Sequence, residues 1–459
     1  LRVADVAFNT TRIVEAIAAA AAADCRFLLF PEMAVTGYTC GDLFFQRNLV
    51  AAAWESLERI AAATAEHEAT VIVGLPVAQG GRLFNCAAFL ASGRLRGLVP
   101  KTFLPSTNEF YEERWFSSAL DSTAATIDWR GEEVPFGTDL LFAADSIDDC
   151  VVGIEICEDL WVANPLSGAM AVAGATVLLN PSASPEILGK EEYRRNLVTT
   201  QSARCLAAYA YASAGPGESS TDLVFAGHSL IAENGQLLAE TDRFEFATRM
   251  ATADIDLDRL ISERRRNNSY GASFSERSFR VIPFPLTDVE VDRVRRPISP
   301  TPFVPSEEAA STRRCREIFH LQTTALAKRL RHTGMIRAVV GLSGGLDSTL
   351  ALLVVVIVGL VAVAAVYFGL RDREQVQARQ AESYYEQGEA YMLEGQYALA
   401  IAAYDQALML SPDHPFAAQR REEATGLLSG APTPTSAVQE ASVEELWQEH
   451  LGYVAAADW

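Results

Sequence analysis

Three apolar segments, each followed closely by a reactive side chain, constrain the fold of this chain more than any other feature. Residues 26–30 lead to Glu32, residues 98–99 to Lys101, and residues 151–156 to Cys157. Short apolar runs of this kind are typical of buried strands. A carboxylate, an ammonium and a thiol are therefore expected at three strand ends, where together they would form a covalent acyl-transfer site.

The chemistry of such a site assigns each residue a role. A thiol is mostly protonated at neutral pH and needs a base and a positive neighbour. Glu32 is expected to take the Cys157 proton and return it to the leaving amine, a contribution of about 10²–10⁴-fold. Lys101 is expected to stabilise the thiolate and the oxyanion, with the Glu158 N–H as the second oxyanion donor. Glu109, which follows Lys101 in the same motif, is a candidate to orient the ammonium or to act as a second acid or base.

Each of these residues also has a simpler explanation when taken alone. A single Cys after a strand is more often a small buried hydrophobic residue, and Pro-Glu or Pro-Lys pairs are common in loops. The occurrence of all three, each in its own local motif, favours the catalytic interpretation.

Composition limits the other possibilities. A length of 459 residues predicts two or three domains, and a hydrophobic content of 49% supports sizeable cores. The formal net charge of −21 argues against binding to the phosphate backbone of nucleic acids and for a soluble acidic protein. The seven cysteines form no Cys-x-x-Cys pair and the six histidines no metal-binding spacing, so neither a disulfide framework nor a metal site is expected.

The N-terminal part alternates between helical and strand patterns, which predicts an α/β domain over residues 1–285. Asn234-Gly235, between two short apolar runs, predicts a hairpin turn. Helices are expected at residues 13–23, 49–68 and 193–206. Strands are expected at residues 26–30, 70–75, 84–90, 95–99, 151–156, 175–179, 208–213, 227–232 and 248–255.

A linker and connector helix are predicted over residues 286–335, because the first half is rich in Pro, Arg and Ser. A short strand is expected at residues 336–342, followed by a Ser-Gly-Gly-Leu-Asp-Ser loop and a helix. Glycine N–H groups, serine hydroxyls and a helix N-terminus can bind phosphates; a simple helix-capping turn is the alternative. The candidate ATP-binding residues are Ser343, Gly344, Gly345, Asp347 and Ser348.

The C-terminal part has a different character. Residues 351–370 carry no charge and are long enough for a transmembrane helix, although a buried core helix has the same composition. Residues 381–414 have the spacing of one tetratricopeptide repeat, for which an ordinary helical hairpin is the alternative. TPR-like helices are expected over residues 372–425. The tail, residues 426–459, begins with a Pro/Thr-rich linker and ends with an amphipathic segment at 443–454.

The three reactive residues and their motifs resemble the Glu-Lys-Cys triad of the nitrilase (carbon–nitrogen hydrolase) superfamily. The addition of the glycine-rich loop makes the chain similar to the glutamine-dependent NAD⁺ synthetase family over about residues 1–353. The segments that carry this resemblance are residues 30–38, 101–105, 109–116, 136–142, 155–159, 202–209 and 215–222.

The resemblance implies an α-β-β-α sandwich in which Cys157 forms a γ-glutamyl thioester from glutamine. Ammonia would then pass through a tunnel to a site where ATP and Mg²⁺ activate deamido-NAD⁺. It also implies assembly into a homo-oligomer. Ser182, Ser184 and either Arg194 or Arg195 are candidates to bind glutamine, with a helix-surface position as the alternative for the arginines. Thr107 stands where relatives often carry Tyr.

Two features depart from that family. The segment before residue 10 resembles the sequence that follows an opening strand, and the synthetase pattern over residues 336–353 stops soon after its loop. A chimera with an unrelated membrane-anchored repeat protein is the resulting hypothesis, with only the glutaminase part active. A stand-alone amidase and a membrane-tethered TPR scaffold with an inert enzyme region are the alternatives.

Overall fold

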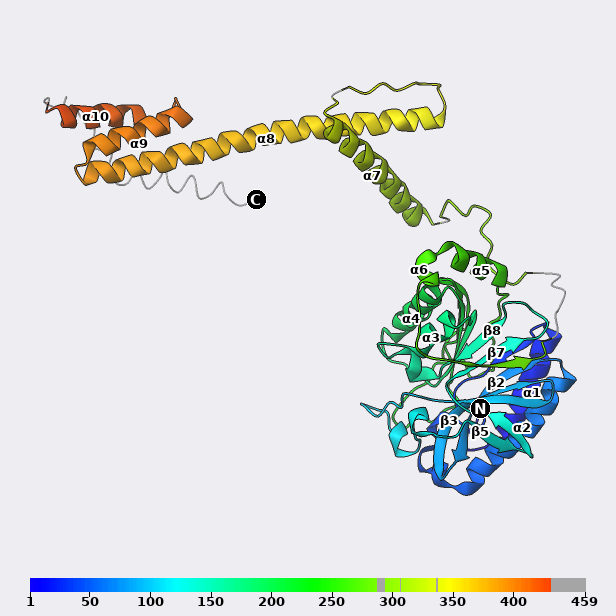
Figure 1. The fold of residues 1–459 in the computed structure, drawn as a ribbon. Coiled ribbons are helices and arrows are strands. Elements are labelled where there is room, and N and C mark those ends of the chain that lie inside the picture. Colours follow the sequence, from blue (N-terminus) through cyan, green and yellow to red (C-terminus); the bar gives the residue numbers. More distant parts are fainter. Residues whose placement is uncertain (287–293, 306, 336, 431–459) are drawn as a thin grey trace. The chain divides into compact units, whose positions relative to one another are not determined.

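The computed structural model describes residues 1–286, 294–305, 307–335 and 337–430, without the side chains of 362 and 365–373 (Figure 1). The chain divides into two compact units, residues 1–299 and 300–459, each of which is described by itself. The predicted linker and amphipathic segment in the tail lie outside the described residues from 431 onward.

Two sheets form the centre of the first unit. One has the order β1-β2-β3-β4 and the other β12-β11-β10-β9-β8-β7-β13, with a separate β5-β6 hairpin. The strands are β1 (Phe27–Leu29), β2 (Thr70–Gln79), β3 (Arg82–Ala91), β4 (Arg94–Pro100), β5 (Thr126–Trp129), β6 (Glu132–Pro135), β7 (Leu140–Ala144), β8 (Val151–Ile154), β9 (Val177–Ser182), β10 (Ala208–Ser213), β11 (Leu230–Glu233), β12 (Gln236–Glu240) and β13 (Arg280–Phe284).

Helices cover the outer faces of these sheets, and short 3₁₀ turns follow several strands. The α-helices of this unit are α1 (Val6–Ala22), α2 (Arg47–Glu66), α3 (Leu166–Val172), α4 (Lys190–Cys205), α5 (Leu257–Arg266) and α6 (Asn268–Gly271). The 3₁₀ turns are η1 (Tyr38–Phe45), η2 (Glu112–Arg114), η3 (Ala119–Asp121) and η4 (Cys157–Leu160).

Three apolar cores separate four layers. Helices α1 and α2 pack on the first sheet, as Ile17 and Leu57 do against Val71. The two sheets pack on each other where the rings of Phe89 and Phe142 stack with centroids 4.0 Å apart. Helices α3 and α4 cover the other face of the second sheet. The layer order is therefore helix, sheet, sheet, helix (Figure 1).

The predicted mixture of helices and strands is confirmed, with one strand misplaced. Asn234 and Gly235 have φ of 46° and 83° and connect the antiparallel strands β11 and β12, as their sequence predicts. Residues 248–255, expected as a strand, have no regular structure, and none of them is fully buried, so the segment presents no apolar face to a core. Strand β13, which closes the sheet beside β7, was not anticipated.

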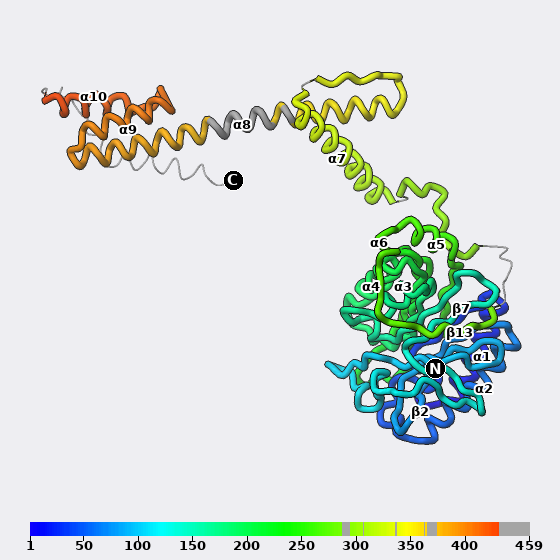
Figure 2. The backbone as a smooth tube through the Cα atoms, in the orientation of Figure 1, coloured from blue at the N-terminus to red at the C-terminus, as the bar shows by residue number. Residues whose placement is uncertain are grey.

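The regular secondary structure of the second unit is entirely helical within its described residues. It contains α7 (Glu308–Thr333), α8 (Leu346–Leu393), α9 (Tyr397–Leu410) and α10 (Ala417–Ser429), which can be followed in Figure 2. The strand expected at 336–342 is not formed at residues 337–342. No described segment of this unit is a strand, so these backbone groups have no sheet to join.

Helix α8 corrects the interpretation of the apolar segment. It runs for 48 residues without interruption, from the glycine-rich loop into the repeat, and residues 351–370 lie within it. Within the part of the chain that the structure describes, no helix combines the length and hydropathy needed to cross a bilayer. The expected membrane anchor is therefore not supported.

The end of α8 and helix α9 form the predicted helical hairpin of residues 381–414. A Cβ added to Gly388 would lie 2.5 Å from the Tyr404 ring, so the tyrosine packs directly against the α8 backbone. Ala400 and Ala407 are buried beside Tyr404, and α10 adds Ala417 and Ala424 to the same core.

Candidate active site

Glu32 lies in the loop that follows β1 and is fully buried. Its Oε1 accepts hydrogen bonds from Asn85 Nδ2 at 2.6 Å and from Lys101 Nζ at 2.7 Å. Its Oε2 accepts a hydrogen bond from the Ala183 N–H at 2.7 Å. These donors come from three different strands or strand ends, so the position of the carboxylate depends on the packing of both sheets.

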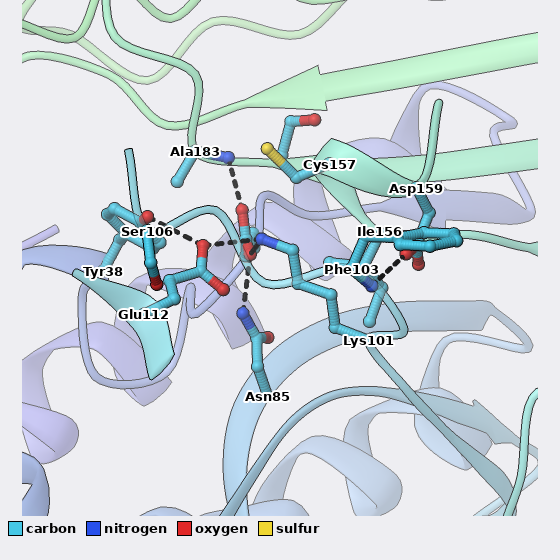
Figure 3. A network of polar contacts seen from close by, with 12 residues as sticks. Tyr38, Asn85, Lys101, Phe103, Ser106, Glu112, Ile156, Cys157, Asp159 and Ala183 are labelled. Atoms are coloured by element: carbon cyan, nitrogen blue, oxygen red, sulfur yellow. Dashed lines mark hydrogen bonds and ion pairs between the residues drawn. The ribbon is translucent and has the colours of Figure 1, made fainter. Parts of the chain in front are cut away.

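Lys101 follows directly after β4, and its ammonium lies between two carboxylates. Nζ is 2.7 Å from Glu32 Oε1 and 2.6 Å from Glu112 Oε1, with all three side chains buried (Figure 3). Burial alone would lower the pKa of the Lys101 ammonium, but Glu112 and Glu32 outweigh it and raise that pKa well above its usual value. The ammonium therefore stays charged.

Glu112, rather than Glu109, is the second carboxylate at Lys101. The Tyr38 hydroxyl also donates to Glu112 Oε1, at 2.8 Å. The chain turns at Asn108, where φ is 54°, and the η2 turn then directs Glu112 inward. Glu109 is half-buried and lies within electrostatic range of Lys190 instead. The role expected for Glu109 thus falls on Glu112 in this geometry.

The Glu112 carboxyl can hold a proton near neutral pH. Burial raises its pKa to about 7, Lys101 opposes this effect and Glu32 adds to it. Its Oε2 is buried and has no hydrogen-bond partner within the described residues. A group with these properties can donate or accept a proton at Oε2.

Cys157 is the first residue of η4, directly after the β8 segment. Its φ is 47°, in the left-handed region that a non-glycine residue rarely adopts. Burial raises the pKa of the Cys157 thiol to about 12, Glu32 raises it further, and Lys101 opposes them. The resting thiol is therefore protonated, and its attack on a substrate requires a base. Figure 3 shows the sulfur near the Ala183 amide and the Lys101 ammonium.

Asp159 ties the Cys157 segment to the Lys101 segment. Its carboxylate accepts hydrogen bonds from the N–H groups of Ile156, Thr102 and Phe103 at 2.9, 3.1 and 2.8 Å. Its position two residues after Cys157 in the same motif is the sequence signal that points to it. These hydrogen bonds hold the segment that follows β8 against the segment that follows β4.

The candidate oxyanion donor Glu158 follows the nucleophile and is half-buried. The Cys157 N–H already donates to Asn180 Oδ1 at 3.1 Å. The N–H of Glu158 is therefore the next backbone donor in the chain that could reach an oxyanion at the thiol.

The candidate glutamine-binding residues differ in their contacts and in their burial. The Ser182 hydroxyl donates to Asn180 Oδ1 at 2.6 Å, and the buried Ser184 lies beside Tyr211. Arg194 is buried, whereas Arg195 pairs with Glu191 and Glu240 near the surface.

Arg194 keeps part of its guanidinium free. Its Nη1 donates to Glu186 Oε2 at 3.1 Å and to His228 Nδ1 at 2.9 Å. Its Nε and Nη2, and the Tyr211 hydroxyl, are buried and have no hydrogen-bond partner within the described residues. The unpaired edge of the guanidinium has the geometry that binds a carboxylate through two hydrogen bonds.

The candidate ATP loop is exposed and precedes α8 in the second unit. Ser343 Oγ lies 3.2 Å from Ser348 Oγ, and the Gly345 N–H donates to Ser343 Oγ at 3.5 Å. Asp347 is in the first turn of the helix, and Gly344 has φ of 80°. Residues 337–342 form no strand, so the loop lacks the support expected of a nucleotide site. No metal-binding group of His, Cys, Asp or Glu occurs in the described part of the chain.

Gly74 on β2 offers a test of the Glu32 position. A Cβ at Gly74 would lie 2.3 Å from Met33 N and 2.9 Å from Glu32 Cα, which are backbone atoms. We expect Gly74→Ala to displace Glu32, to destabilise the protein by about 1–3 kcal/mol, and to lower any activity of the site by about 10²-fold. Gly168→Ala on α3, where the added Cβ meets no atom within 4 Å, is the control. Equal rates in both variants would contradict this packing.

The buried carboxyls predict an unusual pH dependence of stability. Burial raises the pKa of Glu155 to about 7; its oxygens accept hydrogen bonds from the Tyr209 hydroxyl at 2.5 Å and the Ser167 N–H at 2.8 Å. Because the folded-state pKa exceeds the unfolded value, the stability contribution is present at low pH and is lost as pH rises toward about 7. We expect Tm to fall between pH 5 and pH 8. Glu155→Gln should make the loss of unfolding free energy over this range smaller by about 3 kcal/mol. Parallel Tm curves for the two proteins would exclude this contribution.

Comparisons with known proteins identify family relationships for two parts of the chain. The family model described as carbon-nitrogen hydrolase matches residues 2–265, which is more than half of the chain. The model described as tetratricopeptide repeat matches residues 381–414, and this confirms the repeat predicted from the sequence.

Curated relatives cover much of this chain. The glutamine-dependent NAD(+) synthetase of Mycobacterium bovis is 40% identical over 359 residues, which are 77% of this chain and 53% of that protein. The enzyme of the same name from Saccharomyces cerevisiae is 28% identical over 76% of this chain and 49% of its own. The crystal structure of the Cytophaga hutchinsonii enzyme matches 54% of this chain and 40% of its own, with 33% identity and a TM-score of 0.48. The chain thus spans about half the length of the curated relatives it matches.

Proposed function

Because the chain belongs to the carbon-nitrogen hydrolase family, we propose that residues 1–285 form a glutaminase domain. The observation that carries this proposal is the buried cluster of Glu32, Lys101 and Glu112 beside the Cys157 thiol. A protonated thiol, a charged ammonium and two carboxylates in one buried place are suited to hydrolysis of a carboxamide through a thioester.

Acylation uses each of these groups. The Cys157 sulfur attacks the carboxamide carbon of glutamine while Glu32 accepts the thiol proton, so that a C–S bond forms. The oxyanion receives hydrogen bonds from the Lys101 ammonium and the Glu158 N–H. When the C–N bond breaks, Glu32 returns its proton to the leaving nitrogen and ammonia departs. Glu112 supports the ammonium and can exchange a proton at Oε2.

Deacylation repeats the sequence with water. Glu32 accepts a proton from the water that attacks the thioester carbon, and the same two donors stabilise the second oxyanion. The C–S bond then breaks, glutamate is released, and the Cys157 sulfur regains a proton.

Glutamine recognition is proposed for a separate set of groups. The unpaired Nε and Nη2 edge of Arg194 is suited to the α-carboxylate. Ser184 and the carboxylate of Glu158 are suited to hydrogen bonds with the rest of the amino acid. Ser182 acts through Asn180, because its hydroxyl donates to that side chain.

The test of the glutaminase is direct. Purified chain incubated with glutamine should release glutamate and ammonia in equal amounts. A simple aliphatic amide such as propionamide, which has no α-carboxylate, should be a poor substrate. Preference for propionamide over glutamine would favour a stand-alone amidase, and hydrolysis of neither would overturn the proposal.

The synthetase half is proposed on the basis of similarity to the NAD⁺ synthetases. In that family reaction ATP, with Mg²⁺, would activate deamido-NAD⁺ for attack by ammonia, and the chain would act in a homo-oligomer in the cytoplasm. The repeat at residues 381–414 would bind a partner protein. The hypothesis that a synthetase fragment is fused to an unrelated repeat protein remains part of this proposal.

We expect no NAD⁺ from this chain alone, because residues 337–342 provide no strand behind the loop at 343–348. Purified chain with ATP, Mg²⁺, deamido-NAD⁺ and ammonia should give NAD⁺ at the level of a reaction without protein. Free ammonia bypasses the glutaminase, so the result reports on the second unit only. Formation of NAD⁺ in proportion to protein concentration would show that this unit is competent.

A further inference from the structure

Asn180 contacts both polar groups of the nucleophile's own backbone. It lies on β9, with its side chain buried, and its Oδ1 accepts the Cys157 N–H at 3.1 Å. Its Nδ2 donates to the Cys157 carbonyl at 3.4 Å. One carboxamide therefore pairs with the N–H and the C=O of the same residue, as a neighbouring strand would.

The residue held in this way has a backbone conformation that needs support. Cys157 has φ of 47°, and a side chain other than glycine is unfavourable there. Such conformations persist where the surrounding contacts require them. Strand β8 ends at Ile154, so its pairing with β9 does not include Cys157. The hydrogen bonds of Asn180 hold the backbone of Cys157 instead.

The orientation of the carboxamide is itself determined. The Cys157 N–H can only donate, so the atom that it meets at 3.1 Å must be the oxygen Oδ1, which also accepts from the Ser182 hydroxyl at 2.6 Å. The Tyr209 hydroxyl, which donates to the buried Glu155, is also within hydrogen-bonding reach of Asn180. A rotation of the carboxamide by 180° would place its NH₂ group against the Cys157 N–H and its oxygen against the Cys157 carbonyl.

We propose that Asn180 is a positioning residue, which holds the Cys157 backbone in its left-handed conformation so that the thiol faces Glu32 and Lys101. This inference rests on the proposed hydrolysis reaction and adds to it a residue that touches no substrate atom. It also explains why the Cys157 N–H takes no part in the oxyanion site, because Asn180 occupies it and leaves the Glu158 N–H for the substrate.

The decisive variant is Asn180→Ala, which removes the contacts without adding charge or volume. We expect kcat for glutamine to fall at least about tenfold with little change in KM, since misplacement of a reacting group affects the chemical step. A readout that needs no substrate is the alkylation of Cys157 by iodoacetamide at pH 7, followed by mass spectrometry of the peptide. We expect this rate to fall by a similar factor.

The matched control is Asn9→Ala. Asn9 is a buried carboxamide that also pairs with backbone groups, accepting from the Arg2 N–H at 2.7 Å and donating to the Arg2 carbonyl at 2.8 Å. This variant should lose stability as Asn180→Ala does, while the Cys157 alkylation rate of its folded form stays unchanged. The comparison therefore separates loss of positioning from loss of stability.

The two proposals fail in different ways. Absence of glutamine hydrolysis in the wild-type chain would overturn the proposed reaction alone. Cys157 alkylation in folded Asn180→Ala that is as fast as in wild type, or faster, would overturn the positioning role whatever the substrate is.

Discussion

Replacing Cys157 by Ala should reduce glutamate release from glutamine by at least about 10³-fold, because no other group can form the covalent intermediate. The variant should fold, because the substitution removes only one buried sulfur atom. The measurement is the rate of glutamate formation by purified wild-type and variant chains at equal concentration.

Cys150→Ala is the matched control for this experiment. Cys150 is also buried, its pKa is raised to about 11 by burial, and it precedes the same strand β8. It lies in the core between the sheets, and burial, not a charged neighbour, is the cause of its raised pKa. If both variants lose the same activity, the loss comes from packing and Cys157 is not the nucleophile.

Replacing Lys101 by Met should have the largest effect on stability. Without the ammonium, the Glu32 and Glu112 carboxylates stay buried without their counter-ion. Removal of one partner from a buried ion pair costs about 3–5 kcal/mol. Glutamine hydrolysis should fall by at least about 10²-fold in the folded fraction, because an oxyanion donor is lost. Thermal unfolding and initial rates measure the two effects.

A double variant separates these effects. Lys101→Met combined with Glu112→Gln removes one of the two carboxylates that the lysine neutralised, so part of the lost stability should return. Activity should stay low, because the amide at position 112 cannot replace the missing ammonium at the oxyanion. Recovery of activity together with stability would mean that Lys101 has only a structural role.

Local sequence was sufficient to predict that three reactive residues follow strand ends. Glu32, Lys101 and Cys157 each follow an apolar run, and the observed strands β1, β4 and β8 end just before them. Strand ends project into loops at the edge of a sheet, and a reactive residue there is positioned by the strand that precedes it. The repeat at residues 381–414 could also be predicted, because the spacing of its residues reflects the packing of helices that are close together in the chain.

The second carboxylate at Lys101 could not be predicted from the local sequence. Glu109 and Glu112 lie in one loop, and their sequence positions give no preference between them. The choice depends on the turn at Asn108, on the η2 turn and on the Tyr38 hydroxyl, which comes from a distant segment. Likewise, the apolar run at 351–370 was interpreted as a membrane helix, whereas the structure incorporates it into the longer helix α8.

Features that depend on a few neighbouring residues follow from the amino-acid sequence: the strand and helix periods, the Asn234-Gly235 turn, and the reactive residues after apolar runs. Contacts between distant segments, such as Glu112 with Lys101 and Asn180 with Cys157, follow only from the way the chain packs. The reason is physical. Periodicity and turn chemistry act through neighbours in the chain, whereas the partner of a buried polar group is selected by which backbone segments pack together.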